Sequence, residues 1–176
     1  MLAFKVVLED ESGCVGLLNV PITAKIEKAE SDGRGAKEIL ESAFEGAPNE
    51  IKITEEENRF LSSGFYPSEK IGDTYAAWTG GRAVFVLKGE KAKGLKLSCA
   101  TDARQLESGP LEIVLTINGG KEVAKTLASP DWQEVVFPFE AEETGMLRCS
   151  LQLSNTFIPE NDKRSLGILV TDIALI

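Results

Sequence analysis

The chain has 176 residues, a formal net charge of −9 and no histidine. The acidic balance argues against nucleic acids and anionic membrane surfaces as partners, because both attract clusters of lysine and arginine. The lack of histidine excludes Ser-His-Asp and Cys-His catalysis and histidine-ligated metal sites.

The N-terminal part of the chain predicts short strands and one helix. Alternating apolar residues predict strands over 2–9, 14–20 and 22–26. A short helix is expected near residues 36–45, because apolar residues recur there at helical spacing and Gly46 follows.

The middle of the chain begins with a strand expected over 50–54 and continues with three consecutive glutamates, residues 55–57. We interpret the glutamates as a solvated turn. A structural calcium ion is the alternative, because calcium prefers several oxygen ligands. The stretch 64–87 then carries closely spaced aromatic residues, a turn expected at 78–81 and the start of a strand.

The remainder of the chain predicts a regular succession of strands, because apolar and polar residues alternate in it. The expected strands are residues 82–88, 95–101, 111–117, 121–127, 135–139, 147–153 and 166–176. Asn118 and Gly119 mark a hairpin turn, and residues 155–164 form a long loop.

About ten strands at this spacing are typical of a β-sandwich. Alternation on one side indicates that each sheet has a packed face and a solvated face. We therefore predict an all-β fold of two antiparallel sheets, a jelly roll, with one short helix near residues 36–45. A single domain over residues 1–176 is expected, and residues 1–49 as an N-terminal extension of it are the alternative.

The three cysteines, Cys14, Cys99 and Cys149, stand far apart in apolar strand-like contexts. This pattern predicts buried free thiols in a reducing compartment, with one disulfide and a spare thiol as the alternative. The N-terminus lacks the features of a signal peptide, and no apolar stretch is long enough for a membrane helix. A cytoplasmic chain without a membrane partner is expected, and it can equally be a piece of a longer protein.

Part of the sequence carries a recognisable pattern. It consists of Gly64-Phe65-Tyr66-Pro67-Ser68-Glu69, Trp78-Thr79, Trp132 and the closing segment 162–170. The pattern resembles the jelly-roll accessory domains appended to bacterial cell-surface polysaccharide enzymes, notably glycosyltransferases, and covers roughly residues 50–176. The family often has an arginine before the tryptophan, where this chain has Ala77, so Arg82 is a candidate substitute. The resemblance implies carbohydrate recognition of the galactose-binding-like kind and carries over no catalytic role.

Sugar-binding sites combine an aromatic ring, which covers the C–H face of a pyranose, with planar polar groups that bind its hydroxyls. The residues expected to bind ligand on these grounds are Tyr66, Glu69, Tyr75, Trp78, Arg82, Asp102, Arg104 and Arg164. Structural explanations stand beside this one. Tyr66 and Glu69 could form a corner, and an Arg164–Glu69 ion pair could hold the last loop. Trp132 is interpreted as a rim or core aromatic.

Two functions of different classes follow. The first is a non-catalytic carbohydrate-binding accessory module without a cofactor, linked to bacterial cell-surface polysaccharide. The second is a protein-interaction domain that docks a glycosyltransferase-type partner or forms a homodimer. Exposed Trp78 and Tyr75 in a groove would favour the first, and an exposed apolar patch over residues 83–88 the second. A hydrolase that uses two carboxylates is a third alternative, although the sequence singles out no pair.

Overall fold

The computed structural model describes residues 6–9, 15–18, 45–89, 91–140 and 145–176. Its contacts divide the chain into two compact units, Met1–Ala47 and Pro48–Ile176. The expectation of one domain over the whole chain stays a prediction.

The first unit contains β1 (Val6–Glu9) and β2 (Val15–Leu18), which pair antiparallel. Both fall within strands that the alternation of the sequence predicts. The strand expected at 22–26 lies outside the described residues, as does the helix expected near 36–45 except for its last residue, Glu45.

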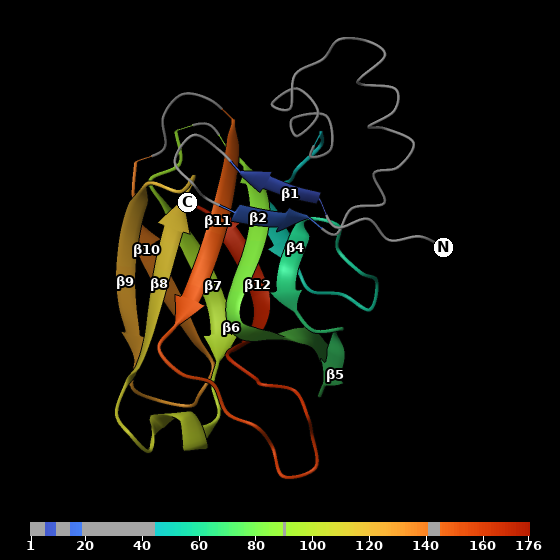
Figure 1. The fold of residues 1–176 in the computed structure, drawn as a ribbon, viewed down its shortest axis with the longest axis vertical. Coiled ribbons are helices and arrows are strands. Elements are labelled where there is room, and N and C mark those ends of the chain that lie inside the picture. Colours follow the sequence, from blue (N-terminus) through green and yellow to red (C-terminus); the bar gives the residue numbers. More distant parts are fainter. Residues whose placement is uncertain (1–5, 10–14, 19–44, 90, 141–144) are drawn as a thin grey trace. The chain divides into compact units, whose positions relative to one another are not determined.

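The second unit is built almost entirely of strands (Figure 1). In chain order they are β3 (Glu50–Lys52), β4 (Leu61–Phe65), β5 (Glu69–Ile71), β6 (Thr74–Lys88), β7 (Gly94–Ala100), β8 (Leu111–Ile117), β9 (Lys121–Leu127), β10 (Gln133–Pro138), β11 (Met146–Leu153) and β12 (Leu169–Leu175). A short 3₁₀ turn, η1 (Ala103–Leu106), follows β7. Among the described residues, no helix is long and apolar enough to cross a membrane.

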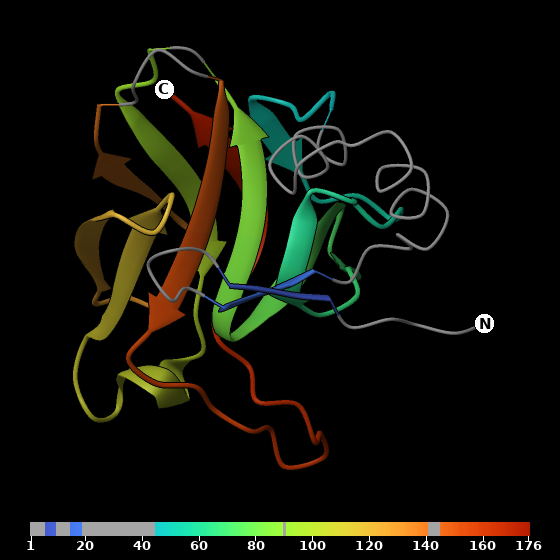
Figure 2. The ribbon, with the colours of Figure 1, turned by 45° about the horizontal axis from the view of Figure 1, so that its top comes forward.

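The strands of the second unit form one antiparallel arrangement in the order β10-β7-β12-β6-β11-β8-β9. The first part of β6 pairs with β5 and β12, and its later part pairs with β4 and β11. Strand β6 therefore belongs to both layers and bends between them, so that the sheet curves nearly into a barrel (Figure 2). The predicted all-β antiparallel sandwich is confirmed, with its two layers joined through β6.

The turn expected at residues 78–81 is wrong, because these residues lie inside β6. Gly80 and Gly81 lack the side chains that would resist a tight bend, so the strand changes layer there without reversing. Strands β4 and β5 were not predicted from the sequence; both are short, and among the described strands each pairs with β6 alone.

The core lies between the two layers and is filled by the apolar side chains of the alternating strands. In β8, Leu111, Ile113 and Leu115 are fully buried, as are Phe85 of β6 and Phe137 of β10. Such alternation places every second side chain of a strand on one face.

Two of the cysteines belong to this core. Cys99 and Cys149 are buried and free, and burial raises the pKa of each thiol to about 12. The expectation of buried free thiols is confirmed for these two, while Cys14 lies outside the described residues.

Candidate functional site

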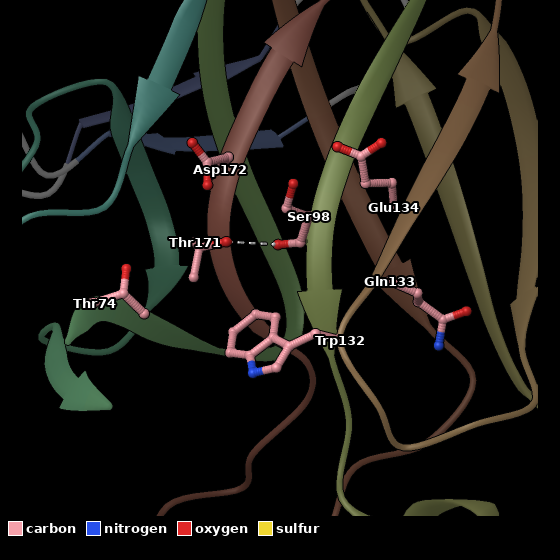
Figure 3. Close-up of a pocket in the computed structure, with 7 residues that line it drawn as sticks. All are labelled: Thr74, Ser98, Trp132, Gln133, Glu134, Thr171 and Asp172. Atoms are coloured by element: carbon pink, nitrogen blue, oxygen red, sulfur yellow. Dashed lines mark hydrogen bonds between the residues drawn. The ribbon is translucent and has the colours of Figure 1, made fainter. Parts of the chain in front are cut away.

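An open groove of about 500 Å³ crosses the outer face of the layer formed by β10, β7 and β12. Its lining side chains are mostly polar and include one tryptophan (Figure 3). They are Thr74, Ser98, Trp132, Gln133, Glu134, Thr171 and Asp172.

Strand register places three of these residues in a row. Glu134 of β10 is paired with Ser98 of β7, and Ser98 is paired with Asp172 of β12. Neighbouring strands lie roughly 4.8 Å apart, so the backbones that carry the two acids are roughly 10 Å apart. Figure 3 shows Ser98 between the two carboxylates. The groove thus has a hydroxyl at its centre and an acid on either side.

A bulge in β12 adds a further polar residue to the groove. The register of β12 against β7 shifts between Val170 and Asp172. Consecutive residues of a regular strand point to opposite faces, whereas a bulge re-aims one of them. Thr171 and Asp172 can therefore both line the groove, and the Thr171 hydroxyl lies 3.5 Å from the carbonyl oxygen of Ser98.

The tryptophan is presented by a braced turn just before β10. The Ser129 hydroxyl donates to Asp131 Oδ2 at 2.6 Å, and the carbonyl of Pro130 accepts from the amide of Thr101. Trp132 follows this turn and keeps 46% of its surface exposed. Of the two interpretations given for Trp132, a rim or a core aromatic, the structure agrees with the rim, since the exposed side chain stands at the edge of the groove.

On the described part of this face, some of the acidic side chains form ion pairs with lysines and one does not. Lys96 Nζ lies 2.8 Å from Glu134 Oε1, and Lys52 Nζ lies 3.7 Å from Glu50 Oε1. The pKa of Lys96 is raised mainly by its hydrogen bond to Glu134, with smaller effects of Asp172 and Glu50. Among the described residues, no lysine or arginine forms an ion pair with Asp172. Asp172 is therefore the acid of the groove that keeps its acceptor oxygens available.

A second polar and aromatic group surrounds the loop 155–166, which we call the closing loop. Arg164 Nη1 lies 2.6 Å from Glu69 Oε1, and Arg164 Nη2 lies 2.7 Å from Asp162 Oδ2. The guanidinium also lies over the Tyr66 ring, whose hydroxyl donates to the carbonyl of Ser165. The ion pair between Arg164 and Glu69 that the sequence suggests is confirmed. Hydrogen bonds to Asp162 and Glu69 raise the pKa of Arg164, and the same contact with Arg164 lowers the pKa of Asp162.

The opposite side of the closing loop is held by aromatic contacts. Trp78 packs edge-on against Phe157, with ring centroids 5.6 Å apart. Arg104 lies 4.7 Å from the centroid of the same Phe157 ring and donates from Nε and Nη2 to the two carboxylate oxygens of Asp102. The hydrogen bond from Arg104 lowers the pKa of Asp102.

The remaining two predicted residues contact other parts of the chain. The Tyr75 hydroxyl donates to Glu55 Oε2 at 3.2 Å, and this hydrogen bond raises the pKa of Tyr75. Arg82 Nε donates to the Ser150 hydroxyl of β11 at 3.2 Å. The structure therefore gathers the other predicted residues around the closing loop but places neither Tyr75 nor Arg82 in contact with them.

Neither test that the sequence suggested for choosing between the two functions is met. Trp78 and Tyr75 are half-buried, and neither is among the residues that line the groove across β10, β7 and β12. Residues 83–87 are all buried, so they expose no apolar patch. Within the described ranges, no group of three or more acids, cysteines or histidines is arranged to hold a metal ion.

Apart from Trp132, which was considered as a rim or core aromatic, the groove residues were missed by sequence reasoning, although a partial signal existed. Ser98 and Glu134 occupy the polar positions of their alternating strands, and Asp172 is the only acid in a strand that is otherwise mostly apolar. The missing information was the pairing of β10, β7 and β12, which alone brings these residues together.

Comparison with known proteins gives distant structural likenesses but no family. No family model and no curated protein matches the sequence. The structure is similar to a family 35 carbohydrate-binding module of Clostridium thermocellum, with a TM-score of 0.44, 8% identity, and coverage of 65% of this chain and 89% of that one. It is also similar to the GH26-CBM35 β-(1,4)-mannanase of Podospora anserina, with a TM-score of 0.45, 13% identity, and coverage of 73% and 28%.

An acetyl xylan esterase of the rumen bacterium Butyrivibrio proteoclasticus has a TM-score of 0.37 and 17% identity over 53% of this chain. The chain spans only 23% of that esterase and 19% of the Cry4Aa toxin of Bacillus thuringiensis, another similar structure. Structural neighbours of this chain thus include carbohydrate-binding modules, and others are enzymes. At these identities and TM-scores the likenesses establish neither a family nor a function for this chain.

Proposed function

We propose that this chain is a non-catalytic carbohydrate-binding module whose site is the groove across β10, β7 and β12. One observation carries the proposal: the exposed indole of Trp132 borders a groove of about 500 Å³ lined by hydroxyls and carboxylates. A lone exposed apolar residue would need no explanation. An exposed indole beside a row of polar side chains, however, is the combination that sugar binding requires.

The indole of Trp132 and the polar row of the groove match the two kinds of surface that a sugar presents. The face of an indole ring covers the apolar C–H surface of a pyranose, and the desolvation of both is favourable. The carboxylates of Glu134 and Asp172 accept hydrogen bonds from sugar hydroxyls, and the hydroxyls of Ser98 and Thr171 can donate or accept. The sugar ring would lie against Trp132 with its hydroxyls directed to the row of polar residues.

The groove is also held in place before any ligand arrives. Lys96 fixes Glu134, the bulge of β12 fixes Thr171, and the turn at 129–131 fixes the start of β10. Side chains that are already ordered lose little entropy on binding, so such a face binds a weakly interacting ligand better than a mobile loop.

The wider setting is part of the proposal and rests on the resemblance of residues 50–176. It places the module beside a bacterial enzyme of cell-surface polysaccharide metabolism, with a glycosyltransferase as the candidate partner. This setting and a cytoplasmic location stay predictions. So does the ligand-binding role that the sequence suggests for Tyr66, Glu69, Tyr75, Trp78, Arg82, Asp102, Arg104 and Arg164, which is the alternative to the groove as the binding site.

The experiment compares the two tryptophans of the chain, Trp78 and Trp132. A panel of soluble neutral and acidic polysaccharides is first screened with the wild-type protein, and the affinity of any hit is then measured by calorimetry. We expect Trp132→Ala to weaken binding about 30-fold or more, because loss of a central aromatic anchor costs about 2 kcal/mol. Trp78→Ala is the matched control and should keep the wild-type affinity per folded molecule.

Fluorescence adds a site-specific readout. In Trp78→Phe, Trp132 is the sole tryptophan, so a shift of its emission on glycan binding would report the groove directly. Loss of binding in Trp78→Ala with unchanged binding in Trp132→Ala would move the site to the closing loop. No binding of any glycan by the folded wild-type protein would overturn the function.

A further inference from the structure

The charge of the groove carries a further inference, which rests on the proposed function. Three acids lie on the outer face of the layer, namely Glu50, Glu134 and Asp172, and strand register gives them two lysines as neighbours, Lys52 and Lys96. Lys96 is hydrogen-bonded to Glu134, and Lys52 Nζ lies 3.7 Å from Glu50 Oε1. Register places Lys52 opposite Asp172, and Asp172 also contributes to the raised pKa of Lys96, but neither lysine is in ion-pair contact with Asp172 among the described residues. Three acids against two lysines leave one negative charge in excess, and one acid is left over without an ion-pair contact.

The acid left over is Asp172, which lines the groove itself. It is half-buried, and among the described residues no cation is in ion-pair contact with it. A carboxylate is only an acceptor of hydrogen bonds, so it needs donors from its ligand. Sugar hydroxyls supply such donors, whereas a carboxylate or sulfate group on a sugar would present a second negative charge.

We propose that the groove selects neutral polysaccharides and rejects chains that carry carboxylates or sulfates, and that Asp172 is the residue that sets this preference. Two like charges in direct contact at a protein surface repel each other strongly. The chain's net charge of −9 adds a weaker repulsion that salt screens over about 10 Å. The local repulsion at Asp172 is therefore the larger of the two when the glycan is bound.

The test uses pairs of polysaccharides that share a backbone and differ in charge. Galactomannan is compared with carboxymethyl galactomannan, and hydroxyethyl cellulose with carboxymethyl cellulose. For a backbone that binds, we expect the neutral form to bind the wild-type protein at least about tenfold more tightly than the carboxymethyl form.

Asp172→Asn keeps the shape of the side chain and removes its charge. We expect this variant to bring the ratio of the two affinities close to one, and part of the affinity for the neutral form to be lost with the charged acceptor. Glu122→Gln is the matched control, because Glu122 is exposed on β9 in the other layer and the substitution changes the net charge by the same amount. Its ratio should remain that of the wild type.

The outcomes separate this preference from the function on which it rests. Equal binding of neutral and carboxymethyl chains, lost in Trp132→Ala, would overturn the preference and keep the binding function. A ratio that falls equally in Glu122→Gln and Asp172→Asn would show that net charge, and not Asp172, sets it. If no member of either pair and no glycan of the wider panel binds the folded protein, the proposed function falls and the preference falls with it.

Discussion

The groove and the closing loop are built from the same kinds of residue but use them differently. Around the closing loop, Arg164 forms ion pairs with Glu69 and Asp162, and Arg104 donates two hydrogen bonds to Asp102. The loop's aromatic ring, Phe157, is contacted edge-on by Trp78 and lies under the guanidinium of Arg104. The closing loop is thus largely satisfied by its own neighbours.

In the groove, one aromatic ring and one carboxylate are not occupied by neighbours among the described residues. Trp132 has 46% of its surface exposed, and Asp172 has no ion-pair partner among the described residues. Residue type therefore does not distinguish a binding site from a structural region of this protein. The two regions differ in whether their hydrogen-bond donors, acceptors and ring faces already contact neighbouring residues. Substitutions around the closing loop should therefore cost stability, and substitutions in the groove should cost affinity.

Among substitutions around the closing loop, the largest expected loss of stability comes from Gly167, where the loop returns to the sheet. A Cβ at this position would lie 2.5 Å from the carbonyl oxygen of Gly80 and 2.6 Å from Thr79 Oγ1, and it would also overlap Leu153. Because backbone atoms cannot give way easily, we expect Gly167→Ala to lower the free energy of unfolding by about 3 kcal/mol. Urea unfolding measures the change, with Gly120→Ala as a control.

Gly120 is a suitable control because the nearest atom to a Cβ there is 3.8 Å away. The molecules of Gly167→Ala that remain folded should bind glycan with the wild-type affinity. A variant of normal stability and reduced affinity would reverse the roles that we assign to the two regions.

A smaller loss of folding stability is expected when the side chain of Arg164 is removed. Its side chain and that of Glu69 are 34% and 38% exposed, so water screens the pair and its loss costs only about 1 kcal/mol. Breaking a buried ion pair would cost a few kcal/mol, but this pair is not buried. Arg164→Ala and Glu69→Gln, alone and together, give the coupling energy by a double-mutant cycle.

Lys163→Ala is the matched control for this cycle, because it removes a neighbouring positive charge from an exposed side chain. It should leave the free energy of unfolding nearly unchanged. If the cycle shows no coupling while glycan affinity falls in Arg164→Ala, Arg164 is a ligand-binding residue, as the sequence suggests.

Most of the fold could be predicted from periodicity, because each predicted strand after residue 82 needs only a two-residue repeat and a turn. Strand β11 illustrates this, since Leu147, Cys149, Leu151 and Leu153 are all buried as the alternation requires. Strand β6 illustrates the limit. Its glycines look like a turn in sequence, and only the pairing of β6 with both layers shows that the chain continues.

The candidate site could be predicted only in part, for a related reason. Contacts around the closing loop, such as that between Arg164 and Glu69, involve residues 95 positions apart, yet opposite charges made the pair a reasonable guess. The row of Glu134, Ser98 and Asp172 depends on the order of three strands that are not all neighbours in sequence. Because strand order is a property of the whole sheet, no local pattern could bring these residues together.

The smallest expected effect concerns Asp102, and it tests whether Arg104 serves the scaffold through charge. Arg104 lowers the pKa of Asp102 below its ordinary value of 3.8, so the contact stabilises the fold above that pH and loses its contribution as the pH falls through the lowered value. Arg104→Gln should lower the free energy of unfolding slightly at neutral pH, because water screens this exposed pair, and the difference from the wild type should shrink below pH 3.8. Urea unfolding across pH measures it. A difference that stays constant with pH would mean that Arg104 stabilises the loop only by packing on Phe157, whose contact with the guanidinium does not depend on the state of Asp102.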